Sequence, residues 1–347
     1  MSSTLDTIAK SLTAAGVKTV NLSFGSGSFL FTVNAARLLV AELPGVRGNL
    51  FWHHPDMENP QTAGKAFGSG GGGIGGDRLW LGPEIAYMWP TTADARRDPF
   101  GTWFMNRTMD PGAYQLLDHG SDHVSVITDM SLTDQRTGQK ISTRVKRTYN
   151  KPGNSPRWPA GVVGASFSTT SELTLLSGDP GAVACTWPLL QVPPGGSLIC
   201  PTHQPVPEPR SYYNPWGDKL RTTPSAVITT VTGEGNNKFG LSPTQTTGRM
   251  GYLRKVGDVT TLIFRAFGPQ PKEPYVDVPR DSDERFGGDA LQSFNGGGFG
   301  EMEAQDPAII AGTGPTSRTN RFVTHVVAGP DAAVRDIASE LLGVAVG

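Results

Sequence analysis

Two short clusters in the 347-residue chain bring chemically active side chains together. The first runs from Asp77 to Glu84 and holds two carboxylates, the guanidinium of Arg78 and the indole of Trp80. Because alternate residues of an extended segment share a face, Arg78 and Trp80 point the same way. This pair suits a sugar ring, since the arginine donates to hydroxyls and the indole covers the apolar C–H face. The competing interpretation puts Trp80 in the core and pairs Arg78 with Asp77 or Glu84.

The second cluster runs from residue 298 to residue 307 and carries Glu301 and Glu303. On a strand, these two glutamates and Gln305 share one face with Phe299. Two carboxylates about 7 Å apart repel each other unless one is protonated, paired or solvated. A raised pKa would suit one of them to general acid–base catalysis. The alternative is an exposed acidic edge strand, although the neighbouring glycine, phenylalanine and methionine residues do not favour it.

Other chemically active residue types form no motif. None of the six histidines has a metal-ligand spacing such as HExxH. The adjacent His53 and His54 would face opposite sides of a strand and could not easily bind one metal ion together. We therefore expect no metal site. A nucleophile elbow is absent, and Cys185 and Cys200 are expected to be two buried thiols. The glycine-rich run 68–76 lacks the lysine and the helix of a phosphate-binding loop, so we expect a flexible loop.

The overall charge limits the classes of partner. Thirty basic and thirty-one acidic side chains give a net charge of −1, so the chain has no field that would attract nucleic acid or an anionic membrane. It has neither an apolar stretch of about 20 residues nor a secretory signal. We therefore expect a cytoplasmic protein without nucleic-acid or membrane partners, and we leave open whether it forms a homo-oligomer.

The elements that must position these clusters are mainly strands. Helical periodicity is present only near the ends, at about 4–15 and 331–342. Short runs of strand-forming residues between turn residues fill the interior. These runs are 18–23, 28–33, 36–42, 123–131, 139–149, 162–176, 182–192, 225–232, 248–255, 258–267, 290–295, 298–305 and 320–328. No linker divides the chain, so we expect one all-β domain spanning residues 1–347, a sandwich or barrel.

Three patches resemble a known superfamily. Residues 302–307 (Met-Glu-Ala-Gln-Asp-Pro) resemble the catalytic-base strand of the aldose 1-epimerases, which belong to the galactose mutarotase-like superfamily. Residues 75–84 and 186–195 look like signatures of an uncharacterised branch of that superfamily. The resemblance implies a β-supersandwich, with Glu303 as the base and Arg78 gripping the substrate.

The resemblance also implies a carbohydrate-acting enzyme of epimerase or isomerase type, which moves a proton on a sugar or oligosaccharide without an organic cofactor. Trp80 or Trp187 would stack on the sugar ring. Further substrate-binding candidates are Asp77, His53 and Gln305.

The family's histidine acid is missing from the matching stretch 148–153. The candidates for the general acid are therefore His53, His54, Glu84 and Glu301.

Three other functions stay open. A polysaccharide or oligosaccharide lyase would abstract a proton beside a uronate carboxylate and neutralise that carboxylate with Arg78. A glycoside hydrolase would pair Glu301 or Glu303 with Glu84. A non-catalytic carbohydrate-binding sandwich would need Arg78 and Trp80 but would tolerate loss of the Glu303 carboxylate.

Overall fold

Strands with period-two patterning make up the largest part of the regular structure, and the expected sandwich is confirmed. The computed structural model describes residues 3–346, with 43% of the chain in strands and 14% in helices. Gly138 and Gly257 lie in the turns of two hairpins, where they take positive φ angles of 73° and 59°. Glycine adopts this backbone conformation without the steric cost that other residues incur.

The described strands form two large antiparallel sheets. The first sheet has the order β1 (Thr19–Phe24), β2 (Gly27–Thr32), β3 (Arg37–Glu42), β4 (Asp77–Gly82), β9 (Val183–Val192), β18 (Phe299–Ala304), β17 (Leu291–Gly296), β14 (Asn237–Leu241) and β11 (Arg210–Ser211), and β19 (Ile309–Ile310) also pairs with β9. The second sheet has the order β12 (Leu220–Thr223), β13 (Ala226–Val231), β10 (Gly196–Pro201), β15 (Arg249–Val256), β16 (Val259–Ala266), β20 (Ser317–Gly329), β8 (Val163–Gly178), β7 (Lys140–Asn150), β6 (His123–Thr133) and β5 (Gln115–His119).

The main core lies between the sheets. Phe31 of β2 meets Tyr149 of β7 edge to face, with ring centroids 5.5 Å apart, and Phe24 of β1 stacks on Phe167 of β8 at the same separation. These contacts join strands that are distant in sequence, because each sheet turns one apolar face inward.

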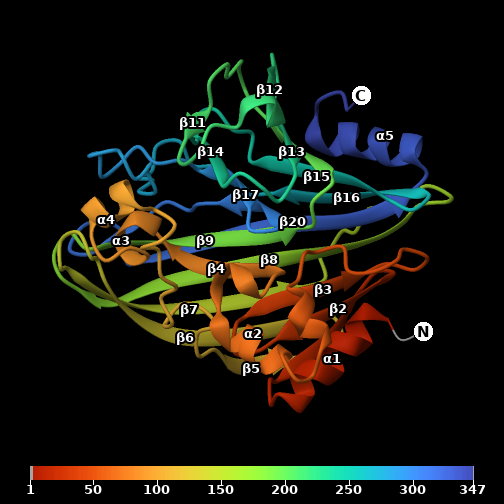
Figure 1. Ribbon diagram of the computed structural model, residues 1–347, viewed down its shortest axis with the longest axis horizontal. Helices are drawn as coiled ribbons and strands as arrows, with labels where there is room; N and C mark the ends of the chain where they lie inside the picture. The colour runs from red at the N-terminus through yellow and green to blue at the C-terminus, as the bar shows by residue number, and fades with distance from the viewer. Residues whose placement is uncertain (1–2, 347) are drawn as a thin grey trace.

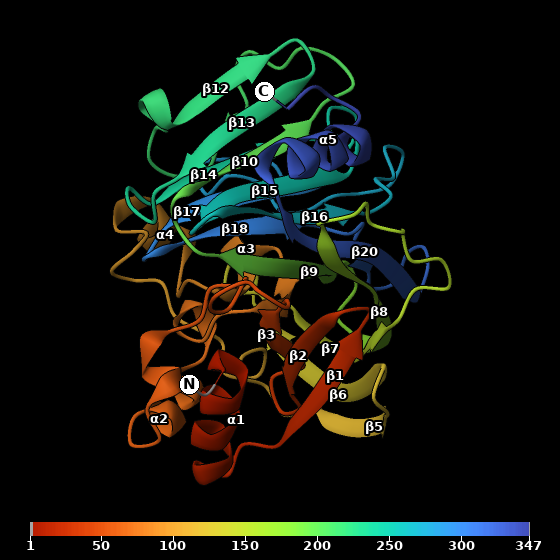
Figure 2. The ribbon, with the colours of Figure 1, turned by 90° about the vertical axis from the view of Figure 1, so that its right-hand side faces the viewer.

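A helix covers the outer side of each sheet. Helix α1 (Thr4–Ala14) begins at Ser3, whose side chain accepts a hydrogen bond from the backbone N–H of Asp6 at 3.1 Å. It packs its apolar stripe on β2 and β3, whereas α5 (Asp331–Leu342) packs on β16 and β20. The two helices therefore lie at opposite ends of the molecule (Figures 1 and 2).

Several elements were not predicted from the sequence. The short helices are α2 (Ala63–Ser69), α3 (Glu84–Tyr87), α4 (Thr92–Arg97), η1 (Pro55–Glu58), η2 (Gly71–Gly73) and η3 (Gly217–Lys219). Elements of three to seven residues are too short to show helical periodicity. Cys185 and Cys200 are free, buried thiols, as expected. Among residues 3–346, no helix is long and apolar enough to cross a membrane.

Candidate active site

Arg78 and Trp80 of the first sequence cluster lie on the outer face of the first sheet, whereas Asp77 lies on its inner face. Asp77 points toward the second sheet, where it pairs with Arg147 of β7. Because successive side chains of a strand alternate, Arg78 and Trp80 point away from the second sheet. Trp187 of β9 is the register partner of Trp80, and the two indoles meet edge to face at 5.4 Å.

Strand β18 places two glutamates beside β9. Glu301 is opposite Gln191, and Glu303 is opposite Leu189. Leu189 is also the register partner of Arg78. Arg78 and Glu303 therefore lie in one row of the sheet, two strand spacings apart, or about 10 Å between their backbones.

A cavity of about 210 Å³ lies over this face of the sheet. Its polar wall includes Arg78, Glu84, Lys238 and Glu301. The aromatic wall includes Trp80, Trp89, Trp103, Trp187, Tyr213, Phe294 and Phe299. This combination of apolar rings with a few charged groups is typical of a small-molecule site.

Arg78 is held by an ion pair and by an aromatic ring. Its Nη2 atom lies 2.5 Å from Glu301 Oε1, and its guanidinium carbon lies 4.1 Å from the centroid of Trp80. Gln191 donates to the same Glu301 oxygen at 3.1 Å. Arg78 Nε and Nη1 have no hydrogen-bond partner among the described residues, although both atoms are buried. The N–H groups of these two nitrogen atoms are available to donate to a ligand in the cavity.

Glu303 lies behind two residues of the cavity wall and is fully buried. Trp187 Nε1 donates to Glu303 Oε2 at 2.9 Å, and Lys238 Nζ lies 3.2 Å from the same oxygen. The other carboxyl oxygen, Oε1, has no hydrogen-bond partner in the part of the chain that the structure describes. An unpaired buried oxygen is costly and is common at functional sites.

Glu84, the first residue of α3, accepts three hydrogen bonds. Lys238 Nζ and the Tyr213 hydroxyl donate to Oε2 at 3.0 and 2.8 Å, and Trp103 Nε1 donates to Oε1 at 3.3 Å. Lys238 thus bridges Glu84 and Glu303, and it also lies 4.4 Å from the ring centroid of Trp187.

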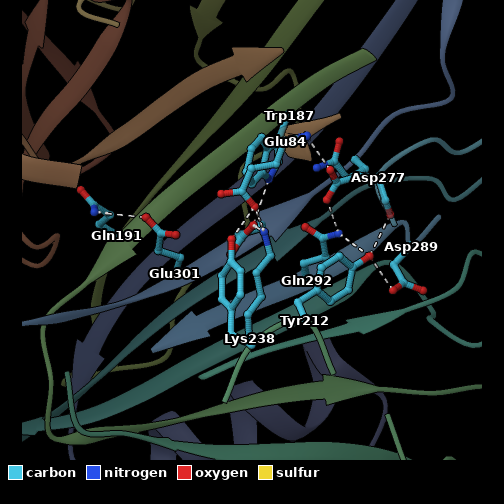
Figure 3. Close-up of polar contacts among 12 residues, drawn as sticks. Glu84, Trp187, Gln191, Tyr212, Lys238, Asp277, Asp289, Gln292 and Glu301 are labelled. Atoms are coloured by element: carbon cyan, nitrogen blue, oxygen red, sulfur yellow. Dashed lines mark hydrogen bonds and ion pairs between the residues drawn. The ribbon is translucent and has the colours of Figure 1, made fainter. Parts of the chain in front are cut away.

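A second group of acids lies beside Lys238 (Figure 3). Asp277 Oδ1 accepts from the backbone N–H of Glu84 at 2.7 Å, and its Oδ2 accepts from Gln292 Nε2 at the same distance. Gln292 also donates to the Tyr212 hydroxyl at 2.8 Å, and that hydroxyl donates to Asp289 at 2.8 Å. Burial raises the pKa of Asp289 to about 7, and burial also raises the pKa of Asp277.

Two carboxyl groups, those of Glu84 and Glu303, share the Lys238 ammonium, and Asp277 acts on it from farther away. Burial raises the pKa of Glu303 to about 8, against the attraction of Lys238 and with the help of Glu301 and Glu84. Burial disfavours the ammonium of Lys238, but the carboxylates of Glu303, Glu84 and Asp277 raise its pKa above the ordinary value. Because these groups interact strongly, they titrate together and not one by one.

The fold brings together most of the residues selected from the sequence. Arg78, Trp80, Glu84, Trp187 and Glu301 all line the cavity. Glu303 lies directly behind them, in contact with Trp187.

Asp77 and Gln305, which were expected to bind substrate, are not part of the cavity wall. Asp77 is buried between the sheets, where Arg147 and Arg265 lie 3.1 and 3.3 Å from its Oδ1. Gln305 is also buried and accepts a hydrogen bond from the thiol of Cys185 at 3.1 Å. Alternation alone puts Asp77 on the face opposite Arg78.

The two adjacent histidines are also absent from the cavity wall. His53 contacts Asn49 at 3.2 Å and Glu58 at 2.9 Å. His54 precedes η1 and accepts from the backbone N–H of Asp56 at 3.2 Å. Neither ring is therefore positioned as a general acid.

Four residues of the site, Lys238, Tyr213, Trp103 and Asp277, were not predicted from the sequence. Lys238 was missed because β14, with the sequence Asn-Lys-Phe-Gly-Leu, contains three poor strand formers. The alternation of residues along β14 could have predicted a strand here, because Phe239 and Leu241 share one face and Lys238 lies on the other. The other three lie outside the strands, so their sequence positions carry no such pattern.

Within residues 3–346, no group of three or more histidine, cysteine, aspartate or glutamate side chains is arranged to hold a metal ion.

The fold is similar to that of solved structures with little sequence identity to this chain. A candidate aldose 1-epimerase from Escherichia coli K12 is 10% identical, with a TM-score of 0.52, over 90% of this chain and 99% of the other. A galactose mutarotase-like protein from Lactobacillus casei ATCC 334 is also 10% identical, with a TM-score of 0.49, over 89% of this chain and all of the other. Comparison with protein-family models and with curated proteins finds no match for the sequence. The chain thus has the galactose mutarotase-like sandwich fold expected from the sequence.

Proposed function

We propose that this protein is a carbohydrate-acting enzyme that interconverts the two anomers of a free sugar, as an aldose 1-epimerase does. The observation that carries the proposal is Glu303, a buried carboxyl group with an unpartnered oxygen behind the wall of an aromatic cavity. The shared fold with the candidate epimerase from Escherichia coli supports it.

The chemistry needs one proton acceptor near the anomeric hydroxyl. When that proton leaves, a carbonyl forms at the anomeric carbon, the bond to the ring oxygen breaks, and the ring oxygen takes up a proton. Rotation of the open chain and reclosure give the other anomer. Glu303 is the proton acceptor in this scheme, and a pKa of about 8 allows it to give and take protons near neutral pH.

The cavity wall supplies the means to hold a sugar. Trp80 and Trp187 offer indole surface to the apolar face of a ring. Arg78 offers the N–H groups of two unpartnered nitrogen atoms to ring hydroxyls. A cavity of about 210 Å³ is smaller than the ~300–1,000 Å³ of drug-sized ligand sites and favours a single sugar ring over a polysaccharide.

Two alternatives fit the charges less well. A lyase needs a cation for the uronate carboxylate, but Arg78 is already paired with Glu301. A hydrolase needs space for the scissile oxygen between its two carboxyl groups. Lys238 fills the space between Glu84 and Glu303, since its ammonium lies within 3.2 Å of both.

The test is the rate at which the protein equilibrates freshly dissolved anomers of neutral aldoses. Polarimetry and two-dimensional NMR exchange spectroscopy both measure this rate. We expect protein-dependent acceleration that the Glu303→Gln variant loses. A wild-type protein that binds the sugars without accelerating their equilibration would instead be a carbohydrate-binding sandwich.

A further inference from the structure

Lys238 is the feature of the cavity that the proposed function leaves without a role. It extends from β14 with only 2% of its side chain exposed, and it lines the cavity. Arg78 is the other cation of the wall formed by the described residues, and a guanidinium does not release its proton in proteins. Of the two cationic groups that the described residues place in this wall, the ammonium of Lys238 can therefore donate a proton and the guanidinium of Arg78 cannot.

Building on the proposed function, we propose that Lys238 is the general acid that protonates the ring oxygen of the sugar. The anomeric oxygen and the ring oxygen are bonded to the same carbon atom. The base and the acid must therefore lie close together. Lys238 lines the cavity, and its Nζ atom lies 3.2 Å from Oε2 of Glu303, which is buried directly behind it.

The reaction step balances between these two groups. Glu303 takes the proton of the anomeric hydroxyl, and the electrons of that O–H bond form the carbonyl. The bond between the anomeric carbon and the ring oxygen breaks, and its electron pair takes a proton from Lys238. Lys238 is then a neutral amine and Glu303 a neutral acid. Reclosure of the rotated aldehyde reverses both transfers and restores the starting charges.

The contacts of Lys238 explain why the two transfers are coupled. The charge of Glu303 favours the ammonium form of Lys238. When Glu303 accepts the sugar proton, that charge disappears, so the pKa of Lys238 falls during the step in which it must donate. Glu84 Oε2, 3.0 Å away, keeps the amine in place.

Tyr213 and the histidines are weaker candidates for this role. The Tyr213 hydroxyl already donates to Glu84, and burial raises its pKa well above the usual value. His53 and His54 do not line the cavity.

The experiment is amine rescue of a Lys238→Ala variant. We expect the variant to lose about 10²–10⁴-fold in turnover, the usual contribution of one positioned acid. Ethylammonium and 2-fluoroethylammonium are similar in size but differ in acidity. If Lys238 donates a proton, both amines restore activity and the more acidic amine gives the faster rate. A merely structural cation would be replaced equally well by either amine, so equal rates would overturn the proposal.

Two further variants make the result decisive. Lys238→Arg keeps a cation between the carboxylates but cannot donate a proton, so it is expected to fold and bind sugar while losing turnover. It decides the question if Lys238→Ala does not fold, and full turnover in Lys238→Arg would overturn the proposal. Lys146→Ala is the control, because Lys146 is 41% exposed and pairs with Glu172 on the second sheet.

Failure of the proposed function is a separate outcome. If the wild-type protein accelerates no anomer exchange, then the epimerase function and the role of Lys238 both fail. If the wild-type protein is active and the Lys238 variants keep its rate, then only the role of Lys238 fails.

Discussion

Replacement of Glu303 by glutamine changes the proposed chemistry and almost nothing else. Glutamine has the size of glutamate, and its side-chain oxygen can still accept from Trp187 Nε1 and from Lys238 Nζ, as Glu303 Oε2 does at 2.9 and 3.2 Å. Because the amide oxygen can keep both contacts, the substitution disturbs the packing of the site little. We therefore expect Glu303→Gln to fold and to bind sugar as the wild type does.

The loss falls on turnover, since an amide cannot accept the sugar proton. One positioned acid–base group contributes about 10²–10⁴-fold, or roughly 3–5 kcal/mol of activation free energy. NMR exchange spectroscopy measures the rate of anomer exchange, and titration of the sugar by NMR or calorimetry measures binding. The expected pattern is a lower kcat with a dissociation constant close to that of the wild type.

The matched control is Glu172→Gln, because Glu172 is a half-exposed glutamate on the second sheet. It should leave the rate of anomer exchange unchanged. A Glu303→Gln protein that keeps the full rate would refute Glu303 as the base. Glu301, which lines the cavity on the same strand, would then be the next residue to test.

The remaining predictions concern binding and stability. Arg78→Lys keeps the charge but loses the planar guanidinium, so we expect a weaker affinity for the sugar with a smaller effect on kcat. Steady-state kinetics separate the two effects. An unchanged KM would contradict the role of Arg78. Asp77→Asn leaves Arg147 and Arg265 buried without their carboxylate, so it should lower the free energy of unfolding by about 3–5 kcal/mol. Denaturant titration measures this loss. The control is Asp129→Asn, which should have little effect because Asp129 is exposed. Burial raises the pKa values of Asp289 and Asp306 to about 7. Between about pH 4 and pH 7, these two carboxyl groups are therefore protonated in the folded state but ionised in the unfolded state. The melting temperature should therefore fall as the pH rises through this range, and an Asp306→Asn variant that keeps the full slope would contradict this explanation.

Much of the fold could be predicted because its signals are local. The stripe Leu5, Ile8 and Leu12 predicts the first helix, and these residues are buried against the first sheet. Alternation likewise predicts that Arg78 shares a face with Trp80, and both line the cavity. A local pattern specifies which side chains share a face of a strand, but not which side of the sheet is inside.

The site could be predicted only in part because its partners come from distant strands. Asp77 was assigned to substrate binding because it precedes Arg78 in sequence. Its actual partners are Arg147 and Arg265, which the second sheet brings across the core. Lys238 is 65 positions from Glu303 in sequence, and only the sheet order β18, β17, β14 brings the two together.

The family resemblance implies a histidine as the general acid within residues 148–153, and the structure shows where part of this stretch lies. Residues 148–150 belong to β7, in the second sheet, and the Tyr149 hydroxyl donates to Asp77 Oδ2 at 3.0 Å inside the core. The Tyr149 side chain therefore points between the sheets and not into the cavity. The donor that we propose comes instead from the cavity wall. Lys238 is on that wall and is already in contact with Glu303.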